Sequence, residues 1–329
     1  MKRTLVLHIG AHRTATTALQ DYLYANFFKL QDEGFFYPYK IRRHRKLMTN
    51  ILNGNRSPEG VATDISGRAD KREQDIHTII LSDEDVSMRR DLSILAEFRA
   101  YFDVKVVYTL RRQDTWLESW FFQNIKWQWN KKLSHCTFDE FLGMREDFHW
   151  IHYGRYVSHL EELFGQENII LNVLEKDQMP QGPIVAFCDS IGLINRDGFH
   201  PAAHTNQSYS PMVSEFMRCL PLDKAPDDFR NILAKACAKI DHDLTGSSEK
   251  HSERLMPPAQ RAAIMAEYAD GNRSIAQHYF GRDALFLEPL PAADAPLAQM
   301  ALPDDSYALM RDLVAPLMQE IITHQKRRP

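Results

Sequence analysis

The sequence predicts an α/β fold, in which a mostly parallel central sheet carries helices on both faces and a helical C-terminal extension follows. Two observations lead to this prediction. Apolar runs of strand length recur as far as Leu174, and segments with helical periodicity separate them. Strands that alternate with helices favour a parallel sheet covered by those helices. The hydrophobic content of 44% and the charged content of 26% are ordinary for a globular protein.

Five apolar runs are the predicted strands, and in chain order they cover residues 5–7, 34–38, 78–81, 104–110 and 168–174. The first helix is expected over 16–32, because leucines recur along it and Gly34 marks its end. Further helices are expected over 91–102, 114–130, 137–164 (in two pieces interrupted near 153–154) and 185–191.

Residues 39–75 break this alternation. They are polar and basic, with four cations close together at Arg42, Arg43, Arg45 and Lys46. We predict an irregular insertion over 38–75, either a substrate lid or a mobile loop. The cations are expected to be solvated, although such a run could attract an acidic glycan or an anionic headgroup.

The C-terminal part predicts three helices over 211–329, separated by proline-rich loops near 256–258 and 288–303. We therefore expect two domains. Residues 1–215 form the α/β core with its cofactor-binding loops, and residues 216–329 form a helical extension packed on that core.

A phosphate-binding loop is predicted directly after the first strand. Gly10 marks a turn, and the threonines that follow supply hydroxyls and backbone N–H groups where a helix begins. Gly10 and Thr17 fit the pattern G-x-x-x-x-G-K-[ST], but Ala15 replaces its second glycine and Thr16 its lysine. Arg13 is the nearby cation. The loop therefore favours a phosphate group over a magnesium nucleoside triphosphate, the alternative being an ordinary helix start capped by threonine.

The run Arg13-Thr14-Ala15-Thr16-Thr17 resembles the K-T-G-T-T loop of sulfotransferases that use 3′-phosphoadenosine 5′-phosphosulfate (PAPS). This resemblance implies a P-loop NTPase-like fold. It also implies that Arg13, Thr14, Ala15, Thr16 and Thr17 bind the 5′-phosphate. Arg13 would in addition act in catalysis, by neutralising charge that develops on the bridging oxygen.

A second motif follows the strand over 104–110, which ends in Arg111 and Arg112. Ser119 lies eight positions after Arg111. In the sulfotransferase family an arginine and a serine with this spacing hold the 3′-phosphate, so the resemblance assigns this role to Arg111 and Ser119, with Arg112 as a possible helper. An arginine and a hydroxyl can satisfy the oxygens of a phosphomonoester. The alternative is a solvated strand end.

The catalytic base is expected after the strand over 78–81. Alignment of this segment with the sulfotransferase family places Glu84 at the position of the catalytic base. Asp83 and Asp85 are the alternative candidates for that role. A general base contributes about 10²–10⁴ in rate. The alternative is that residues 82–85 form an acidic cap, which is favourable beside a helix N-terminus.

These residues together imply a sulfotransferase that moves a sulfuryl group from PAPS to a hydroxyl, or less readily an amine, of a small molecule or glycan, leaving the bisphosphate PAP. Two alternatives stay open, a P-loop small-molecule kinase or NTPase and a nucleotide-binding relative without activity. No metal site is predicted, because His149 and His152 lack companion ligands at a recognisable spacing. His12 and His8 are expected to be satisfied structural residues.

Charge and composition argue against several other classes of protein. A formal net charge of −4 argues against a nucleic-acid-binding protein. The four cysteines show no C-x-x-C spacing, and no apolar run is long enough for a membrane span. We therefore expect a cytoplasmic protein with reduced thiols, and the sequence indicates no oligomeric state. Asn206 and Ser208 are expected either to approach the nucleotide or to cap a helix.

Overall fold

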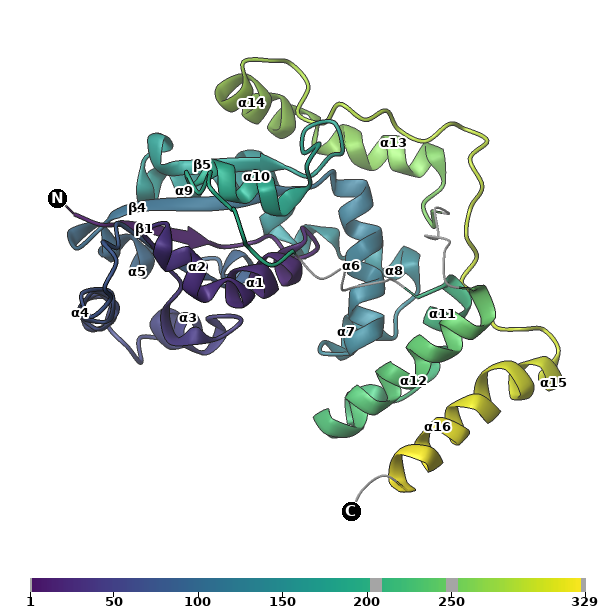
Figure 1. The fold of residues 1–329 in the computed structure, drawn as a ribbon. Coiled ribbons are helices and arrows are strands. Elements are labelled where there is room, and N and C mark those ends of the chain that lie inside the picture. The colour runs from purple at the N-terminus through teal and green to yellow at the C-terminus, as the bar shows by residue number, and fades with distance from the viewer. Residues whose placement is uncertain (1, 202–208, 247–253, 327–329) are drawn as a thin grey trace. The chain divides into compact units, whose positions relative to one another are not determined.

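The computed structural model describes residues 2–201, 209–246 and 254–326 (Figure 1). Asn206 and Ser208 lie outside these ranges. The chain forms two compact units, each built from three segments. The first comprises Met1–Gln113, Phe148–Thr205 and Ala266–Pro289, and the second comprises Asp114–Asp147, Asn206–Met265 and Leu290–Pro329. The domain boundary at residue 215 stays a prediction.

The first unit contains a five-stranded sheet in which every neighbouring pair is parallel, in the order β2-β3-β1-β4-β5. The strands are β1 (Thr4–His8), β2 (Phe35–Phe36), β3 (Thr78–Ser82), β4 (Asp103–Leu110) and β5 (Ile169–Val173). Each lies within or overlaps one predicted apolar run. The α/β prediction is confirmed, and the central strand β1 is buried along Leu5, Val6 and Leu7.

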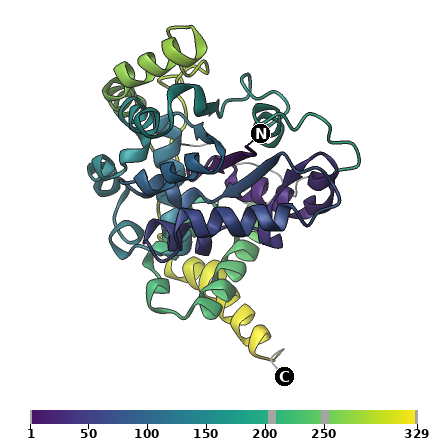
Figure 2. The ribbon, with the colours of Figure 1, turned by 90° about the vertical axis from the view of Figure 1, so that its left-hand side faces the viewer.

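Helices cover both faces of this sheet (Figure 2). His8 on β1 pairs in register with Val107 on β4, so the next residue, Tyr108, projects to the opposite face. The His8 ring contacts Phe187, and the Tyr108 ring contacts Tyr156. Helix α10, which carries Phe187, therefore lies on one face, and helix α9, which carries Tyr156, lies on the other.

The helices of the first unit have the following bounds: α1 (Thr16–Ala25), α2 (Phe27–Asp32), α3 (Arg45–Leu52), α4 (Pro58–Ala69), α5 (Ser93–Ala96), α9 (Tyr153–Phe164), α10 (Pro183–Ser190) and α14 (Ala269–Phe280). The helix predicted over 16–32 is thus divided at Asn26, whose backbone (φ −99°, ψ 22°) leaves the helical conformation.

The prediction of an irregular stretch over 39–75 is wrong, because α3 and α4 occupy most of it. Each helix buries an apolar face, at Leu47 and Ile51 in α3 and at Val61 and Ile65 in α4. The Ser57 side chain caps α4 by accepting from the Gly60 N–H. Apolar residues four apart, together with this cap, were sequence signals for helices. A role of the insertion as a lid stays a prediction.

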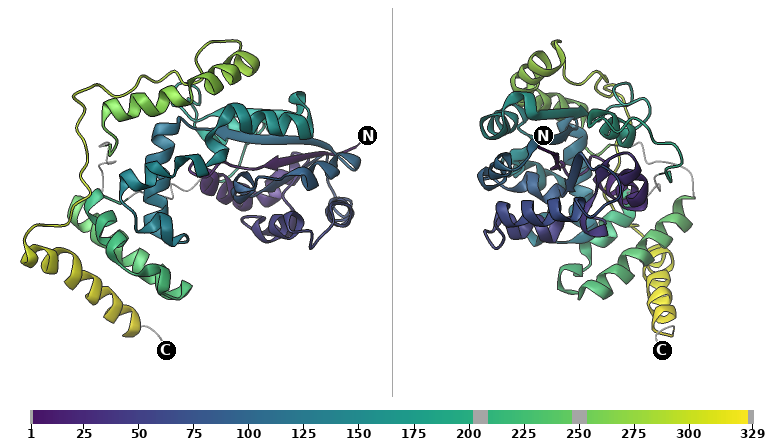
Figure 3. Two further views of the ribbon diagram at one scale, coloured as in Figure 1. Left: turned by 180° about the vertical axis from the view of Figure 1, so that it is seen from behind. Right: turned by 60° about the vertical axis from the view of Figure 1, so that its left-hand side comes forward.

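The second unit is helical. Its helices are α6 (Gln113–Trp127, which begins at the last residue of the first unit), α7 (Lys131–Ser134), α8 (Phe138–Gly143), α11 (Pro211–Cys219), α12 (Asp227–Thr245), α13 (Pro258–Glu267), α15 (Ser306–Leu309) and α16 (Ala315–Lys326). The prediction of three helices after residue 211 is therefore too low. The predicted loops at 256–258 and 288–303 do separate helices, but each of the three predicted helices is divided once more: α11 from α12, α13 from α14 of the first unit, and α15 from α16. Helices α12 and α16 lie side by side (Figures 1 and 3).

Candidate active site

The candidate site lies at the carboxyl ends of β1 and β4, two neighbouring strands after which the chain continues to opposite sides of the sheet. After β1 the chain continues to β2 and β3 on one side of the sheet, and after β4 it continues to β5 on the other. Ligands of open α/β sheets bind at the carboxyl ends of strands at such a switch point. The loop after β1 holds Arg13, and β4 ends directly before Arg111.

These two arginines are in contact. Nη1 of Arg111 donates to the carbonyl oxygen of Arg13 at 2.8 Å. The hydroxyl of Tyr153 donates to the Arg111 carbonyl oxygen at 2.6 Å and accepts from the Arg111 N–H at 3.0 Å, which fixes the Arg111 backbone. The two anion-binding elements expected from the sequence therefore adjoin within one unit of the molecule.

The backbone of the loop has the geometry of an anion-binding nest. Arg13 has φ +66° and Ala15 has φ +65°, whereas Thr14 between them is not in the positive-φ region. Alternation of this kind turns successive N–H groups toward one concavity, as in other phosphate loops. The Thr14 hydroxyl donates to the Ala11 carbonyl at 2.6 Å. Ala15 is the N-cap of α1 and supplies no side-chain acceptor, so the alternative of a threonine-capped helix start is wrong.

Arg13 is suited to hold an anion. Burial lowers the pKa of its guanidinium to about 10. A cation that has lost hydration gains more from a bound anion than a solvated one does. Together with the nest at residues 13–15, this environment fits a phosphate group.

Glu84 lies against the same loop. It begins a short 3₁₀ turn (Glu84–Met88) after β3 and is 5% exposed. A Cβ atom at Gly10, where φ is +107°, would lie 3.1 Å from the Glu84 Cβ, so this position requires glycine. Gln20 of α1 donates to Glu84 Oε2 at 2.6 Å, and Arg43 Nη1 lies 3.0 Å from Oε1. Both carboxylate oxygens are thus held.

Arg43 is the functional candidate that sequence reasoning missed. Its guanidinium lies within 3.0 Å of three carboxylates, those of Asp83, Glu84 and Asp85. The expectation that it is solvated is wrong, since its side chain is only 17% exposed. Some 40 residues separate it from its partners, so no local pattern could pair them. Gln20 was missed for the same reason.

The neighbouring carboxylates differ in their surroundings. Burial raises the pKa of Asp83 to about 6, although the nearby charge of Arg43 acts in the opposite direction. For Asp85, burial is outweighed by the hydrogen bond from His12 and the charge of Arg43, which hold its pKa below the ordinary value. Asp83 also caps the short turn by accepting from the Asp85 N–H at 3.3 Å. The acidic-cap alternative therefore describes Asp83.

Two histidines flank the loop. His12 Nε2 lies 2.9 Å from Asp85 Oδ1, and His12 is buried. His8 Nδ1 lies 2.8 Å from the Ser82 hydroxyl, and burial lowers the pKa of His8 to about 4. His8 is therefore a neutral structural residue. His12, beside the loop, has a side-chain partner, as expected of a satisfied histidine.

Arg112 and Ser119 are the remaining candidate residues. Nη1 of Arg112 donates to the carbonyls of Glu288 and Pro289 at 2.8 and 3.1 Å, so this guanidinium contacts backbone carbonyls. Ser119 lies on α6 in the second unit, and its pairing with Arg111 stays a prediction.

In residues 2–201, 209–246 and 254–326, no three His, Cys, Asp or Glu side chains are grouped so that they could hold a metal ion. Within the same described ranges, no helix combines the length and apolarity that crossing a membrane requires.

Comparisons with known proteins identify the family of the chain. The family model described as a sulfotransferase domain matches residues 5–174, more than half of the chain. An uncharacterized protein of Archaeoglobus fulgidus is 23% identical over 203 residues, which are 60% of this chain and 52% of that protein. The chain thus spans about half the length of that curated relative.

Among solved structures, a sulfotransferase from Alicyclobacillus acidocaldarius aligns with 76% of this chain and 98% of its own, at 15% identity and a TM-score of 0.40. A likeness at that level carries no argument by itself. The family model spans β1 to the residue after β5, including the phosphate loop, Glu84 and Arg111. The chain belongs to the sulfotransferase family.

Proposed function

We propose that the protein transfers a sulfuryl group from PAPS to a hydroxyl, or less readily an amine, of a small molecule or glycan. One observation carries this proposal. Arg111 donates to the carbonyl of Arg13, so two anion-binding elements adjoin at the carboxyl ends of β1 and β4. Two adjacent anion sites suit one nucleotide that carries phosphate groups at two positions.

The donor's two ends would be held by different residues. Arg13 and the loop through Thr17 bind its 5′-phosphate and stabilise the charge that grows on the leaving oxygen. Arg111, together with Ser119, binds its 3′-phosphate and so selects this donor over ATP. When bound, the donor supplies an activated sulfuryl group.

Glu84 is the proposed base for the acceptor. Its two oxygens are oriented by Gln20 and Arg43, and each keeps a lone pair that can accept a proton. Its position against Gly10 puts it beside the loop that would hold the reacting end of the donor. His12 is the rival base, with Asp85 as the group that orients its ring.

Nucleotide preference is the first test. Thermal shift of the full chain is measured with PAP and, separately, with Mg-ATP. We expect stabilisation by PAP without magnesium. Stabilisation by Mg-ATP alone would favour the kinase alternative and contradict the proposal.

The role of Arg111 is tested by the ratio of two affinities. Arg111→Ala should weaken binding of PAP much more than binding of adenosine 5′-phosphate, because only PAP carries the 3′-phosphate. Arg112→Ala is the matched control, since its guanidinium contacts the carbonyls of Glu288 and Pro289. Equal losses for the two nucleotides in Arg111→Ala would remove the 3′-phosphate role.

The base is tested by turnover with binding intact. We expect Glu84→Gln to lower kcat by about 10²–10⁴ while PAP still binds. If His12→Asn has that effect and Glu84→Gln does not, His12 is the base. Binding of PAP without desulfation of PAPS in the unchanged protein would identify a relative without activity.

A further inference from the structure

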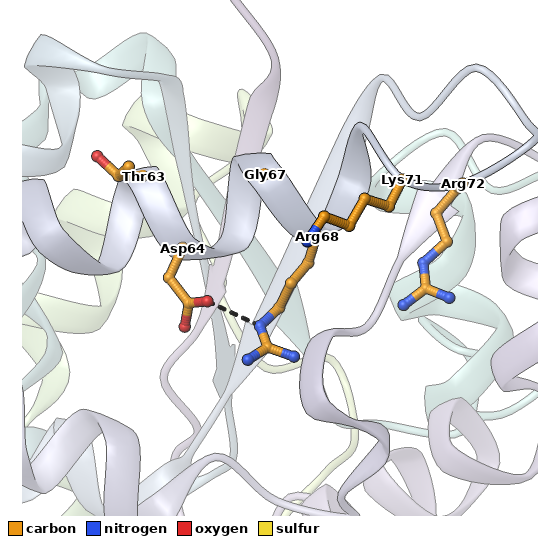
Figure 4. A pocket seen from close by; sticks show the side chains of 6 residues that line it. All are labelled: Thr63, Asp64, Gly67, Arg68, Lys71 and Arg72. Carbon is orange, nitrogen blue, oxygen red and sulfur yellow. Dashed lines mark hydrogen bonds and ion pairs between the residues drawn. The ribbon is translucent and has the colours of Figure 1, made fainter.

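A basic groove lies along the end of α4, on a surface that the proposed chemistry does not use. It encloses about 450 Å³ and is lined by Thr63, Asp64, Gly67, Arg68, Lys71 and Arg72 (Figure 4). We call it the α4 groove. Three cations and one carboxylate line it, so its formal charge is positive although the whole chain is negative.

The cations of the α4 groove are unequally neutralised. Arg68 Nε donates to Asp64 at 2.8 Å, and Asp64 also lies 3.5 Å from Arg56 and accepts from the Tyr39 hydroxyl. Within the described ranges no carboxylate lies within ion-pair distance of Lys71 or Arg72. The positive charge at this end of the groove is therefore available to a ligand.

Aromatic rings hold the two guanidinium groups in place. Arg68 lies over the Tyr39 ring at 4.8 Å and Arg72 over the Phe36 ring at 5.0 Å. Cations after a helix C-terminus are also favourable to the helix dipole. The helix dipole does not require the guanidinium groups to stack on rings of another segment. The stacking restrains both guanidinium groups in advance, which reduces the side-chain entropy lost when they bind an anion.

The α4 groove is connected to the candidate active site by a short segment. Tyr39 contacts Asp64 and Arg68 of the groove, and Arg43, four residues later, contacts Glu84. Four residues span at most roughly 14 Å when extended. The side chains of Tyr39 and Arg43 add to this span, so an acceptor that occupies the groove and reaches toward Glu84 has to be an extended chain of several sugar units.

We propose that the α4 groove binds the sulfate, phosphate or carboxylate groups of an acidic oligosaccharide, which makes the acceptor a polyanionic glycan. That the glycan is the acceptor rests on the proposed function, whereas its binding to the α4 groove does not depend on that function. Three cations in one small hollow suit a ligand with a few charges. Nucleic acid and anionic membranes favour larger basic surfaces, and the net charge of the chain is negative.

The test is calorimetric titration of the full chain with a sulfated tetrasaccharide and with its desulfated, neutral counterpart. We expect the sulfated ligand to bind at least about tenfold more tightly, and more weakly as salt rises. The double variant Lys71→Gln/Arg72→Gln should weaken its binding about tenfold or more. Lys131→Gln/Lys132→Gln, which removes the same charge from α7, should leave it unchanged.

Arg72 also packs on Phe36, so its substitution could disturb the fold. The single variant Lys71→Glu is therefore a second test, because the Lys71 side chain is exposed. Unaltered binding in both groove variants would overturn the proposal. So would binding of phosphatidylserine vesicles or an oligonucleotide in place of the sulfated ligand. The PAP thermal shift is measured in parallel: loss of that shift with glycan binding intact would remove the proposed donor and leave the groove assignment standing.

Discussion

Two arginines of this protein are each held by several carboxylates, and their surroundings differ. Arg261, in the second unit, contacts Asp114 and Glu118 of α6, and all three side chains are at most 4% exposed. Arg43, in the first unit, contacts three carboxylates but keeps 17% of its side chain exposed, and Asp85 among its partners is 33% exposed.

We propose that this difference separates a structural cluster from a functional one. Arg261 lies in a closed site, where its charge compensates two carboxylates that could not otherwise stay buried. Arg43 lies at the end of a parallel sheet beside a phosphate-type loop, where an arriving ligand can compete for its partners. We expect loss of Arg261 to affect mainly stability and loss of Arg43 to affect mainly turnover.

The largest effect is expected for Arg261→Ala. Two buried carboxylates would lose a buried ion-pair partner, which costs about 3–5 kcal/mol of unfolding free energy. Urea unfolding followed by circular dichroism measures the loss. The matched control is Arg261→Met/Asp114→Asn/Glu118→Gln, which removes all three charges and should recover most of the stability. A loss below about 1 kcal/mol in Arg261→Ala would contradict the structural role.

The next effect concerns His44, which adjoins Arg43. Burial lowers the pKa of His44 to about 4, and its Nδ1 accepts from the Ser82 N–H at 3.1 Å. The unfolded chain therefore binds a proton at higher pH than the folded one. His44 should contribute stability that is full above about pH 6.5 and is lost as the pH falls toward 4, by about 3 kcal/mol.

Unfolding free energy measured between pH 7 and pH 4 checks this prediction. His8, whose pKa is also lowered to about 4, acts in the same direction. His44→Gln should therefore show a smaller acid-induced loss, and His8→Gln/His44→Gln the smallest. Identical pH dependence of His44→Gln and the unchanged protein would show that His44 is not held neutral.

A smaller stability effect is expected for Arg43→Ala. Asp85 keeps His12 and Arg45 as partners, and the raised pKa of Asp83 lets that group become neutral, so the loss should be about 1–3 kcal/mol. Turnover should fall about tenfold to a hundredfold, because Glu84 loses the donor that orients Oε1. Arg43→Lys should restore part of the turnover. If turnover falls only in proportion to the fraction of folded protein, the role of Arg43 is structural.

The smallest effect is expected for Ala15→Gly. Ala15 adopts φ +65°, which costs a residue with a Cβ about 1 kcal/mol that glycine does not lose. We expect the thermal midpoint to rise by about 1–2 °C with PAP affinity unchanged or improved. Ala18→Gly inside α1 is the control and should be destabilising. A lower midpoint for Ala15→Gly would show that the loop relaxes without the left-handed conformation.

Much of the fold was predictable because its signals are local. The five strands are apolar runs, and the loop after β1 and the arginine at the end of β4 are each visible within a few residues. Helices α3 and α4 were also within reach, since Ser57 and Pro58 start α4 and its apolar residues recur. The cations around Arg43 make the segment polar overall, which masks this pattern. The role of Arg43 itself was not predictable, because its partners lie 40 residues away.

The sequence by itself determined the parallel α/β architecture, the phosphate-type loop, the acidic turn at Glu84 and the strand-end Arg111. Periodicity and turn chemistry depend on neighbouring residues only, so they can be recognised without a fold. The tertiary structure alone decided that Arg111 contacts the Arg13 carbonyl, and that Gln20 and Arg43 hold Glu84. Those contacts depend on β4 and β3 flanking β1, and strand order is fixed by packing across the whole sheet, which no short stretch of sequence specifies.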